Sequence, residues 1–195
     1  VSSLPESGYA NAPLNDMGVF EIPPLSLGDA TFLGASLIKG ESLVATPSVD
    51  AVAEELAALV DCVPFYIHHV VDRAAASQLE LSSATVSTLV EELIEDEMDQ
   101  LNLRYYRERL DVYYGGPSKT LALHVLDVLA GVDESLAVDR ILELIASIDV
   151  PPDSEALRTI LTRLIQDHYL VVDKSQYSFR FSFIKRSWEH QRGIL

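Results

Sequence analysis

The stretch from Pro152 to Ile184 changes its hydrophobic period halfway along, and this change limits the fold of the chain more than any other feature. In its first half, apolar residues recur at helical spacing from Ala156 to Ile165. In its second half, aromatic residues alternate with polar ones, as in a strand with one buried face. The pattern predicts a helix capped by Asp153 or Ser154 and then a β-hairpin: helix Glu155–His168, strand Tyr169–Asp173, tip Lys174–Gln176, and a second strand that carries Tyr177, Phe179 and Phe181.

Two further amphipathic helices are predicted directly before this stretch. They span Ser118–Ala130 and Glu134–Ser147, and a last helix is predicted over Phe183–Arg192. Three helices followed by a β-hairpin are the elements of a winged helix, which is a helix-turn-helix with a β-hairpin wing. In this interpretation Glu155–His168 is the recognition helix.

The upstream part of the chain is predicted to be helical as well. Apolar stripes, serine caps and the helix-starting Pro64 mark five helices between Ser26 and Tyr114. Gly115-Gly116-Pro117 ends the fifth helix, and we expect the domain boundary there. The predicted fold is therefore mainly α, with a helical bundle over residues 26–115 and a winged-helix domain with a β-hairpin over residues 116–195. Val19–Ile22 is a short strand candidate, followed by Pro23-Pro24.

Charge is distributed unevenly between these two parts. The first 98 residues hold 16 Asp and Glu against two Lys and Arg, whereas residues 156–195 hold seven Lys and Arg against three Asp and Glu. The acidic part would repel a phosphate backbone, and the last part could tolerate one. The single Cys62 excludes an internal disulfide, and no apolar run reaches the length of a membrane span. We therefore expect a cytoplasmic protein without a membrane partner.

Several motifs that suggest catalysis have simpler explanations. The segment from Gly115 to Thr120 ends in Lys-Thr but lacks the spacing of a phosphate-binding loop, and a helix break explains it better. His68 and Asp72 share a helix face next to His69 but lack an evident third metal ligand. No Gly-x-Ser-x-Gly motif is present, so a free-standing hydrolase is the least favoured class.

Basic residues of the predicted recognition helix and wing are candidates for contacts with DNA. A winged helix uses such positions to enter a groove and to hold the adjacent phosphates. The same helix also carries Glu155 and Asp167, and the whole chain has a net charge of −16. An ordinary solvated surface or a protein-docking face therefore stays open beside DNA binding. The candidates are Arg158, Thr162, Arg163, Lys174 and Arg180, with Lys185 and Arg186 further along the chain.

Three segments together resemble the C-terminal half of a bacterial P-loop ATPase of the AAA+/STAND type, related to archaeal ATPases and NB-ARC proteins. Phe20–Ser26, with Asp29-Ala30 after it, is similar to the last strand of the ATPase core running into the lid domain. Asp61–Ile67 resembles the Gly-x-Pro motif of the family, with Cys62 at the position where the family often has Gly. The predicted winged helix, ending in Tyr177–Trp188, resembles the module that follows the lid.

The resemblance implies that residues 1–25 are the end of an ATPase core, that residues 26–115 are its lid, and that Val63 and Pro64 lie on the adenine side of the nucleotide. The parent protein would bind ATP or ADP with Mg²⁺. This chain alone would hydrolyse nothing and need no cofactor, since the Walker A and Walker B segments would lie upstream. Its function would be to complete the nucleotide site and to relay the nucleotide state to a DNA or protein partner. The alternative is a DNA-binding regulator whose acidic helical domain dimerises or senses a ligand.

Overall fold

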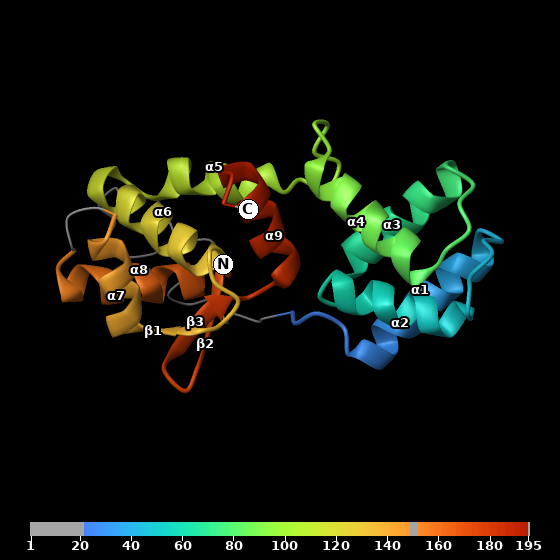
Figure 1. Ribbon diagram of the computed structural model, residues 1–195, viewed down its shortest axis with the longest axis horizontal. Helices are drawn as coiled ribbons and strands as arrows, with labels where there is room; N and C mark the ends of the chain where they lie inside the picture. Colours follow the sequence, from blue (N-terminus) through green and yellow to red (C-terminus); the bar gives the residue numbers. More distant parts are fainter. Residues whose placement is uncertain (1–21, 149–151, 195) are drawn as a thin grey trace, which may run out of the picture. The chain divides into compact units, whose positions relative to one another are not determined.

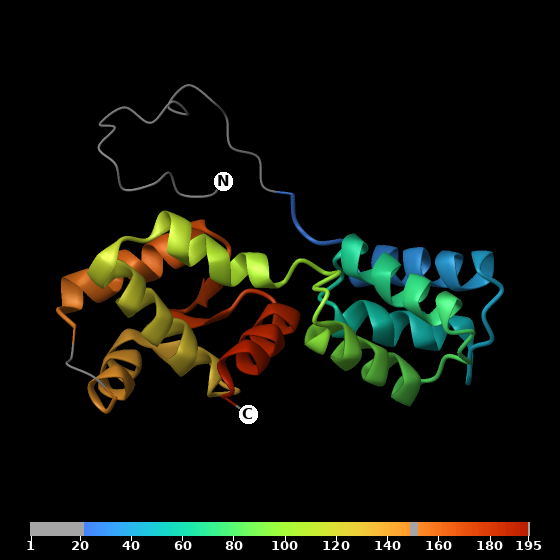
Figure 2. The same ribbon diagram turned by 90° about the horizontal axis from the view of Figure 1, so that it is seen from above.

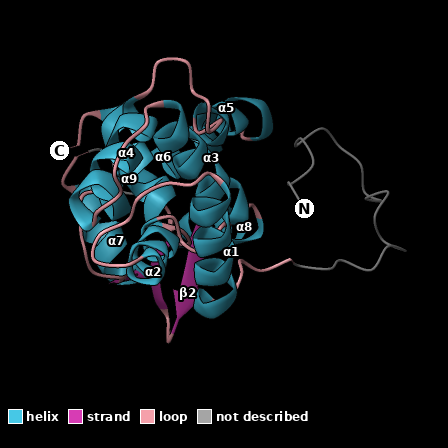
Figure 3. Ribbon diagram, turned by 90° about the vertical axis from the view of Figure 1, so that its right-hand side faces the viewer, coloured by secondary structure: helices cyan, strands magenta, loops and turns pink. Residues whose placement is uncertain are grey.

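The computed structural model describes residues 22–148 and 152–194 of the chain (Figure 1). Within these ranges the chain is mainly helical, and its strands form one small antiparallel sheet (Figure 3). The described residues divide into two compact units, residues 22–103 and residues 104–194, called the bundle and the C-terminal unit below. The predicted fold class, a helical bundle followed by a winged helix with a β-hairpin, is confirmed.

The bundle consists of four helices, three of which are capped by serines. The side chains of Ser26, Ser48 and Ser82 accept hydrogen bonds from the first-turn amides of α1, α2 and α4. Helix α3 begins instead with a proline in its first turn, where no amide partner is required. The four helices are α1 (Leu27–Gly40), α2 (Val49–Leu59), α3 (Pro64–Ala76) and α4 (Ser83–Glu95).

The bundle contains a structural repeat of two helical hairpins. Helices α1 and α3 are both followed, two residues after their last residue, by a residue in the left-handed conformation. These residues are Ser42 (φ 57°) and Gln78 (φ 51°). The following leucine amides then donate to carbonyls five residues back, Leu43 to Ile38 and Leu79 to Ala74. The two extended connections that continue to α2 and α4 lie side by side and form a parallel bridge between Ala45 and Leu81. This pairing holds the two hairpins together at one end.

Small residues let α1 and α2 pack closely. A Cβ atom added to the buried Gly34 would lie 3.3 Å from the Cβ of Ala53, so a larger residue there would push the two helices slightly apart. Ala30, Ala57 and Ala74 are also fully buried, together with the aliphatic side chains Ile38, Val52 and Leu56. The core of the bundle therefore consists mainly of small and aliphatic side chains among its described residues.

The C-terminal unit has the connectivity of a winged helix preceded by one extra helix (Figures 1 and 2). The sheet order is β1-β3-β2, so that the hairpin β2–β3 pairs through β3 with the short strand before α7. The elements are α5 (Arg104–Tyr113), α6 (Gly116–Ala130), β1 (Leu136–Ala137), α7 (Val138–Ala146), α8 (Ser154–Gln166), β2 (Leu170–Asp173), β3 (Gln176–Phe179) and α9 (Ser182–Arg192).

The C-terminal unit follows the predicted elements with three local differences. Leu136 and Ala137 are extended and pair with β3, so α7 begins later than the predicted helix. The wing tip is only two residues long, because Lys174 (φ 46°) and Ser175 (φ 67°) are both left-handed and Gln176 already pairs with Asp173. Phe181 caps α9 instead of continuing β3. Asp153 is the residue that caps α8.

The division between the units differs from the predicted boundary at Gly115-Gly116-Pro117. The helix break is present there, but α5 packs within the C-terminal unit, so the division falls between Leu103 and Arg104. Its physical reason is a set of side-chain contacts from α5 to α8 and β2, described below. The predicted strand Val19–Ile22 lies outside the described residues except for Ile22, which is 91% exposed and has no secondary structure.

Candidate functional site

The turn before α3 holds Val63 and Pro64, the residues that the family resemblance places beside adenine. Asp61 (φ 53°) and Cys62 (φ 57°) are consecutive left-handed residues, a backbone conformation that glycine adopts most easily. Val63 is the N-cap of α3 without a side-chain cap, and Pro64 follows in the first turn. The left-handed backbone at Cys62 gives a physical reason for glycine at the corresponding position of the resembled motif.

The segment that leads into α1 lies against this turn. The amide of Leu25 donates to the carbonyl of Cys62 over 3.2 Å, so two segments far apart in the sequence meet at the start of α1 and α3. Ile22 is 91% exposed here, and Leu27 and Phe65 are about half exposed. Val63 and Pro64 are half-buried. This end of the bundle therefore presents apolar surface to its surroundings.

The other polar residues of this region show no metal site. His69 packs edge-on against the ring of Phe65, with 4.4 Å between the ring centroids, while His68 and Asp72 are exposed. No cluster of three or more potential ligands occurs in the described parts of the chain. Burial, and secondarily the charge of Asp61, raise the pKa of the Cys62 thiol. The thiol is therefore a poor nucleophile near neutral pH.

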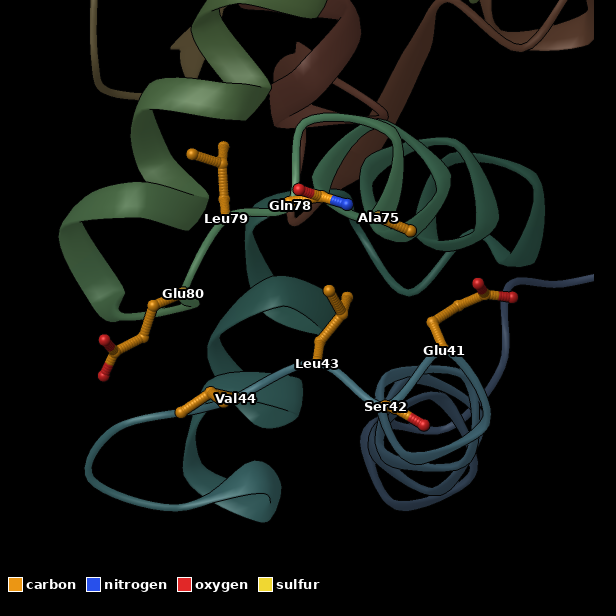
Figure 4. Close-up of a pocket in the computed structure, with 8 residues that line it drawn as sticks. All are labelled: Glu41, Ser42, Leu43, Val44, Ala75, Gln78, Leu79 and Glu80. Atoms are coloured by element: carbon orange, nitrogen blue, oxygen red, sulfur yellow. The ribbon is translucent and has the colours of Figure 1, made fainter.

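The opposite ends of α1 and α3 enclose a pocket of about 370 Å³ (Figure 4). Leu43, Ala75 and Leu79 are its half-buried apolar residues. Glu41 and Glu80 lie on opposite sides of it, and Glu80 also accepts a hydrogen bond from the hydroxyl of Thr46 over 2.9 Å. No histidine, cysteine, lysine or arginine is among its described lining residues, and its other polar side chains are those of Ser42 and Gln78.

On the winged helix, two of the predicted DNA-binding residues lie on the exposed face of α8. Arg158 and Thr162 line a shallow hollow of about 390 Å³. The Thr162 hydroxyl donates to the Arg158 carbonyl over 2.9 Å, and its proton is thus directed into the helix. Lys174 is exposed at the wing tip, next to the exposed Asp173. The other residues that line the hollow are Glu155, Thr159, Arg163 and Gln166.

Arg163 and Arg180 are engaged in contacts inside the C-terminal unit. The Arg163 guanidinium donates to the Tyr113 carbonyl over 2.5 Å and lies 4.3 Å from the centre of the Tyr114 ring. Arg180 Nη1 lies 3.1 Å from His168 Nδ1, and both arginines are half-buried. The five predicted residues are therefore not one basic surface, because two of the three arginines hold the unit together.

A buried carboxylate at the end of α8 organises these contacts. Asp167 is 1% exposed, and its Oδ2 accepts a hydrogen bond from the Tyr114 hydroxyl over 2.8 Å. Arg109 Nη2 is 3.8 Å from Oδ1, with its guanidinium 5.5 Å from the Tyr169 ring centre. The Tyr169 hydroxyl in turn donates to the Tyr106 carbonyl over 2.6 Å. Asp167 is thus an internal residue and not a surface charge of the recognition helix.

The environment of this network keeps both phenols protonated. Burial raises the pKa of Tyr114, and its hydrogen bond to Asp167 raises it further. Burial also raises the pKa of Tyr169, against the lowering effect of the Arg109 charge. Local sequence patterns do not predict this cluster, because its members come from α5 and the residue after it and from the segment between α8 and β2. The only signal was the accumulation of Tyr and Arg in Arg104–Tyr114.

The remaining basic residues of α9 contact α6 and the loop after it. Asp127 accepts hydrogen bonds from Trp188 Nε1 over 2.9 Å and from Arg192 Nη2 over 2.6 Å. Lys185 donates to the Val132 carbonyl over 2.6 Å and lies 3.2 Å from an Asp133 oxygen. The guanidinium of the half-buried Arg186 lies 5.7 Å from the ring centre of Phe183. Trp188, Arg192 and Lys185 therefore anchor α9, whereas the contact of Arg186 lies within the helix itself.

The segment Gly115–Thr120 forms the start of α6. Gly115 is the N-cap, Gly116 is left-handed (φ 40°), and Pro117 lies in the first turn. It follows a helix and not a strand, so the predicted helix break is confirmed. No helix in the described residues has the length and apolar character needed to cross a membrane. Comparison of the chain with models of protein families and with curated proteins finds no match.

Proposed function

We propose that the chain is the regulatory part of a P-loop ATPase. In this proposal the bundle completes the nucleotide site of an upstream core through Val63 and Pro64. The winged helix relays the nucleotide state to a partner. ATP or ADP with Mg²⁺ would be bound by the parent protein, whose core supplies the phosphate-binding residues and the hydrolytic chemistry. The residues of this chain contribute apolar contacts with the base.

The observation that carries the proposal is the hydrogen bond from the Leu25 amide to the Cys62 carbonyl. It places the segment that resembles the core-to-lid connection directly against the turn that resembles the Gly-x-Pro motif. Pro64 is half-buried there, and the adjacent Phe65 is 49% exposed, so an apolar face is accessible to a flat base. An aromatic base binds such a face by stacking and by removal of apolar surface from water.

The partner of the winged helix, in this proposal, is a protein and not DNA. Arg163 and Arg180 are engaged inside the unit, which leaves Arg158 and Lys174 as the exposed cations among the five predicted residues. Glu155 and Asp173 are exposed beside them. When a face with balanced charge binds a phosphate backbone, few counterions are released and the gain in binding free energy is small. Exposed Val171 and Val172 on β2 add apolar surface that a protein can cover.

The proposal is tested in a longer protein that includes the coding sequence preceding Val1. We expect this protein to bind Mg·ATP with micromolar affinity, measured by calorimetry. Substitution Pro64→Ala should weaken binding by roughly threefold to tenfold, because it removes part of the apolar surface against the base. The matched control is Pro117→Ala, which changes a proline in the first turn of α6 and should leave the affinity unchanged.

Two results would overturn the proposal. One is an upstream sequence without a phosphate-binding loop. The other is an equal effect of Pro64→Ala and Pro117→Ala on ATP affinity, which would show that Pro64 acts only on helix stability.

A further inference from the structure

Helix α5 is attached to the C-terminal unit differently from its neighbours. Leu110 is its one buried residue, whereas α6 buries five apolar residues. Because burial of apolar surface supplies most of the free energy that holds a helix in place, α5 has a weaker apolar anchor than α6. Its attachment depends on polar contacts instead.

Among these polar contacts, the buried ion pair contributes little net stability. The Arg109–Asp167 pair is separated by 3.8 Å, with both side chains largely buried. Among the described residues, the buried Arg109 Nε has no hydrogen-bond partner. A buried ion pair with this geometry recovers only part of the desolvation free energy of its two charges. The hydrogen bonds of Tyr114 to Asp167 and of Tyr169 to the Tyr106 carbonyl therefore carry much of the docking.

The same contacts determine where the Arg163 side chain lies. Arg163 borders the exposed hollow on α8, but its guanidinium is bound by the Tyr113 carbonyl and the Tyr114 ring at the end of α5. If α5 left its position, both contacts would be lost together. The guanidinium would then be on the hollow that Arg158 also lines.

We propose that α5 is a reversibly docked helix that controls the accessibility of Arg163 on the recognition helix α8. In the docked state Arg163 is an internal contact of the unit. In the released state the guanidinium no longer has its two contacts with the end of α5, which changes what the exposed face of α8 can bind. Because α5 directly follows Leu103, the last residue of the bundle, a displacement of the bundle acts first on α5. The proposal concerns this chain alone and holds whether or not an ATPase core precedes it.

Hydrogen exchange and arginine modification of the intact chain test this proposal. We expect the amides of α5 to exchange at least tenfold faster than those of α6 and α9, since α5 opens without global unfolding. Tyr114→Phe removes one hydroxyl and should raise α5 exchange by roughly fivefold to tenfold, the factor for loss of one hydrogen bond. Phenylglyoxal modification of Arg163, followed by mass spectrometry, should rise by a similar factor, with Arg158 as the unchanged internal reference.

The matched control is Tyr105→Phe, which removes a hydroxyl from a 45% exposed tyrosine of the same helix and should change neither readout. Tyr169→Phe removes the bond to the Tyr106 carbonyl and should reproduce the effect of Tyr114→Phe. The proposal fails if Tyr114→Phe accelerates exchange equally in α5, α6 and α9. It also fails if α5 exchange rises while Arg163 modification stays at the wild-type rate.

Discussion

The bundle and the C-terminal unit bury different kinds of side chain. Among the described residues, the bundle core is alanine and aliphatic residues with one buried tyrosine, Tyr66. The C-terminal unit buries several large aromatics and two polar side chains, Asp167 and Ser187, the buried polar side chains of residues 22–148 and 152–194. The aromatics are Tyr114, Tyr169, Phe179, Phe183 and Trp188. The core of the bundle is thus held by the shape of its apolar side chains. The core of the C-terminal unit is held in addition by buried hydrogen bonds between particular side chains.

This difference separates two kinds of specificity. Small residues such as Gly34 and Ala53 allow close helix packing, but they accept many partners of similar shape. A buried carboxylate such as Asp167 is compatible with few positions of α5. If α5 lies elsewhere, the carboxylate stays buried but loses its hydrogen bond from the Tyr114 hydroxyl. The C-terminal unit, which carries the proposed docking face of α8, is the one that contains the polar network.

The largest expected effect is on the bundle core. Leu56 is fully buried in α2, and Leu56→Ala should lower the stability of the bundle by about 3 kcal/mol through lost burial and a cavity. Because the C-terminal unit has its own core, calorimetry should show one transition moved to lower temperature and a second one unchanged. A single transition that moves as a whole would show that the two units unfold together.

The next effect concerns the anchor of α9. Asp127→Ala leaves the indole of Trp188 and the guanidinium of Arg192 without their shared acceptor. We expect a loss of about 2 kcal/mol in the C-terminal unit, from a partly buried charged hydrogen bond. Denaturant titration followed by Trp188 fluorescence reports this unit directly, since Trp188 is the only tryptophan. Asp133→Ala is the control, because the Asp133 carboxylate is fully solvated and its ion pair with Lys185 should therefore contribute little to stability.

The pH dependence of stability should also distinguish the two units. The pKa values of Tyr114 and Tyr169 are raised in the folded state, so their protonated forms are favoured by folding. This contribution is complete below about pH 10, the unfolded value, and is lost as the pH rises toward the folded values. The C-terminal unit should therefore lose stability between pH 10 and 11. In Tyr114→Phe the decrease should be smaller, and an unchanged slope would mean that Tyr114 does not contribute.

The smallest expected effect is on DNA. With Arg158 and Lys174 as the exposed cations of the recognition helix and wing tip, we expect no shift of a labelled duplex even at about 50 mM salt. Fluorescence anisotropy with duplexes of mixed sequence measures this. Tight binding that disappears in Arg158→Ala would instead support the DNA-binding regulator and contradict a protein-docking face.

Local patterns in the sequence predicted most of the secondary structure. The apolar stripe from Leu157 to Leu164 and the caps Ser26, Ser82 and Asp153 act within a few residues, so they can be recognised without tertiary contacts. The two-residue strand β1 was missed because it is too short to show alternation and forms only by pairing with Tyr177.

The candidate site was less predictable, for a physical reason. Arg163 was predicted as a surface cation, and its spacing on α8 is compatible with that role. Its actual partner is the Tyr113 carbonyl, 50 residues earlier in the chain. Arg180 was likewise predicted as a surface cation, but its side chain contacts the ring of His168. Which polar side chains are internal depends on tertiary packing, and periodicity carries no information about it. The role of Val63 and Pro64 stays a prediction from resemblance.

In the proposed function this chain supplies only one side of a nucleotide site, a claim that measurements of ATP binding can refute. Calorimetry of the isolated 195-residue chain with Mg·ATP, together with a turnover assay, should show no hydrolysis and no affinity tighter than about millimolar. The protein extended by its upstream coding sequence should bind in the micromolar range. Stoichiometric micromolar binding by the isolated chain would contradict the claim, because the chain would then contain a complete site.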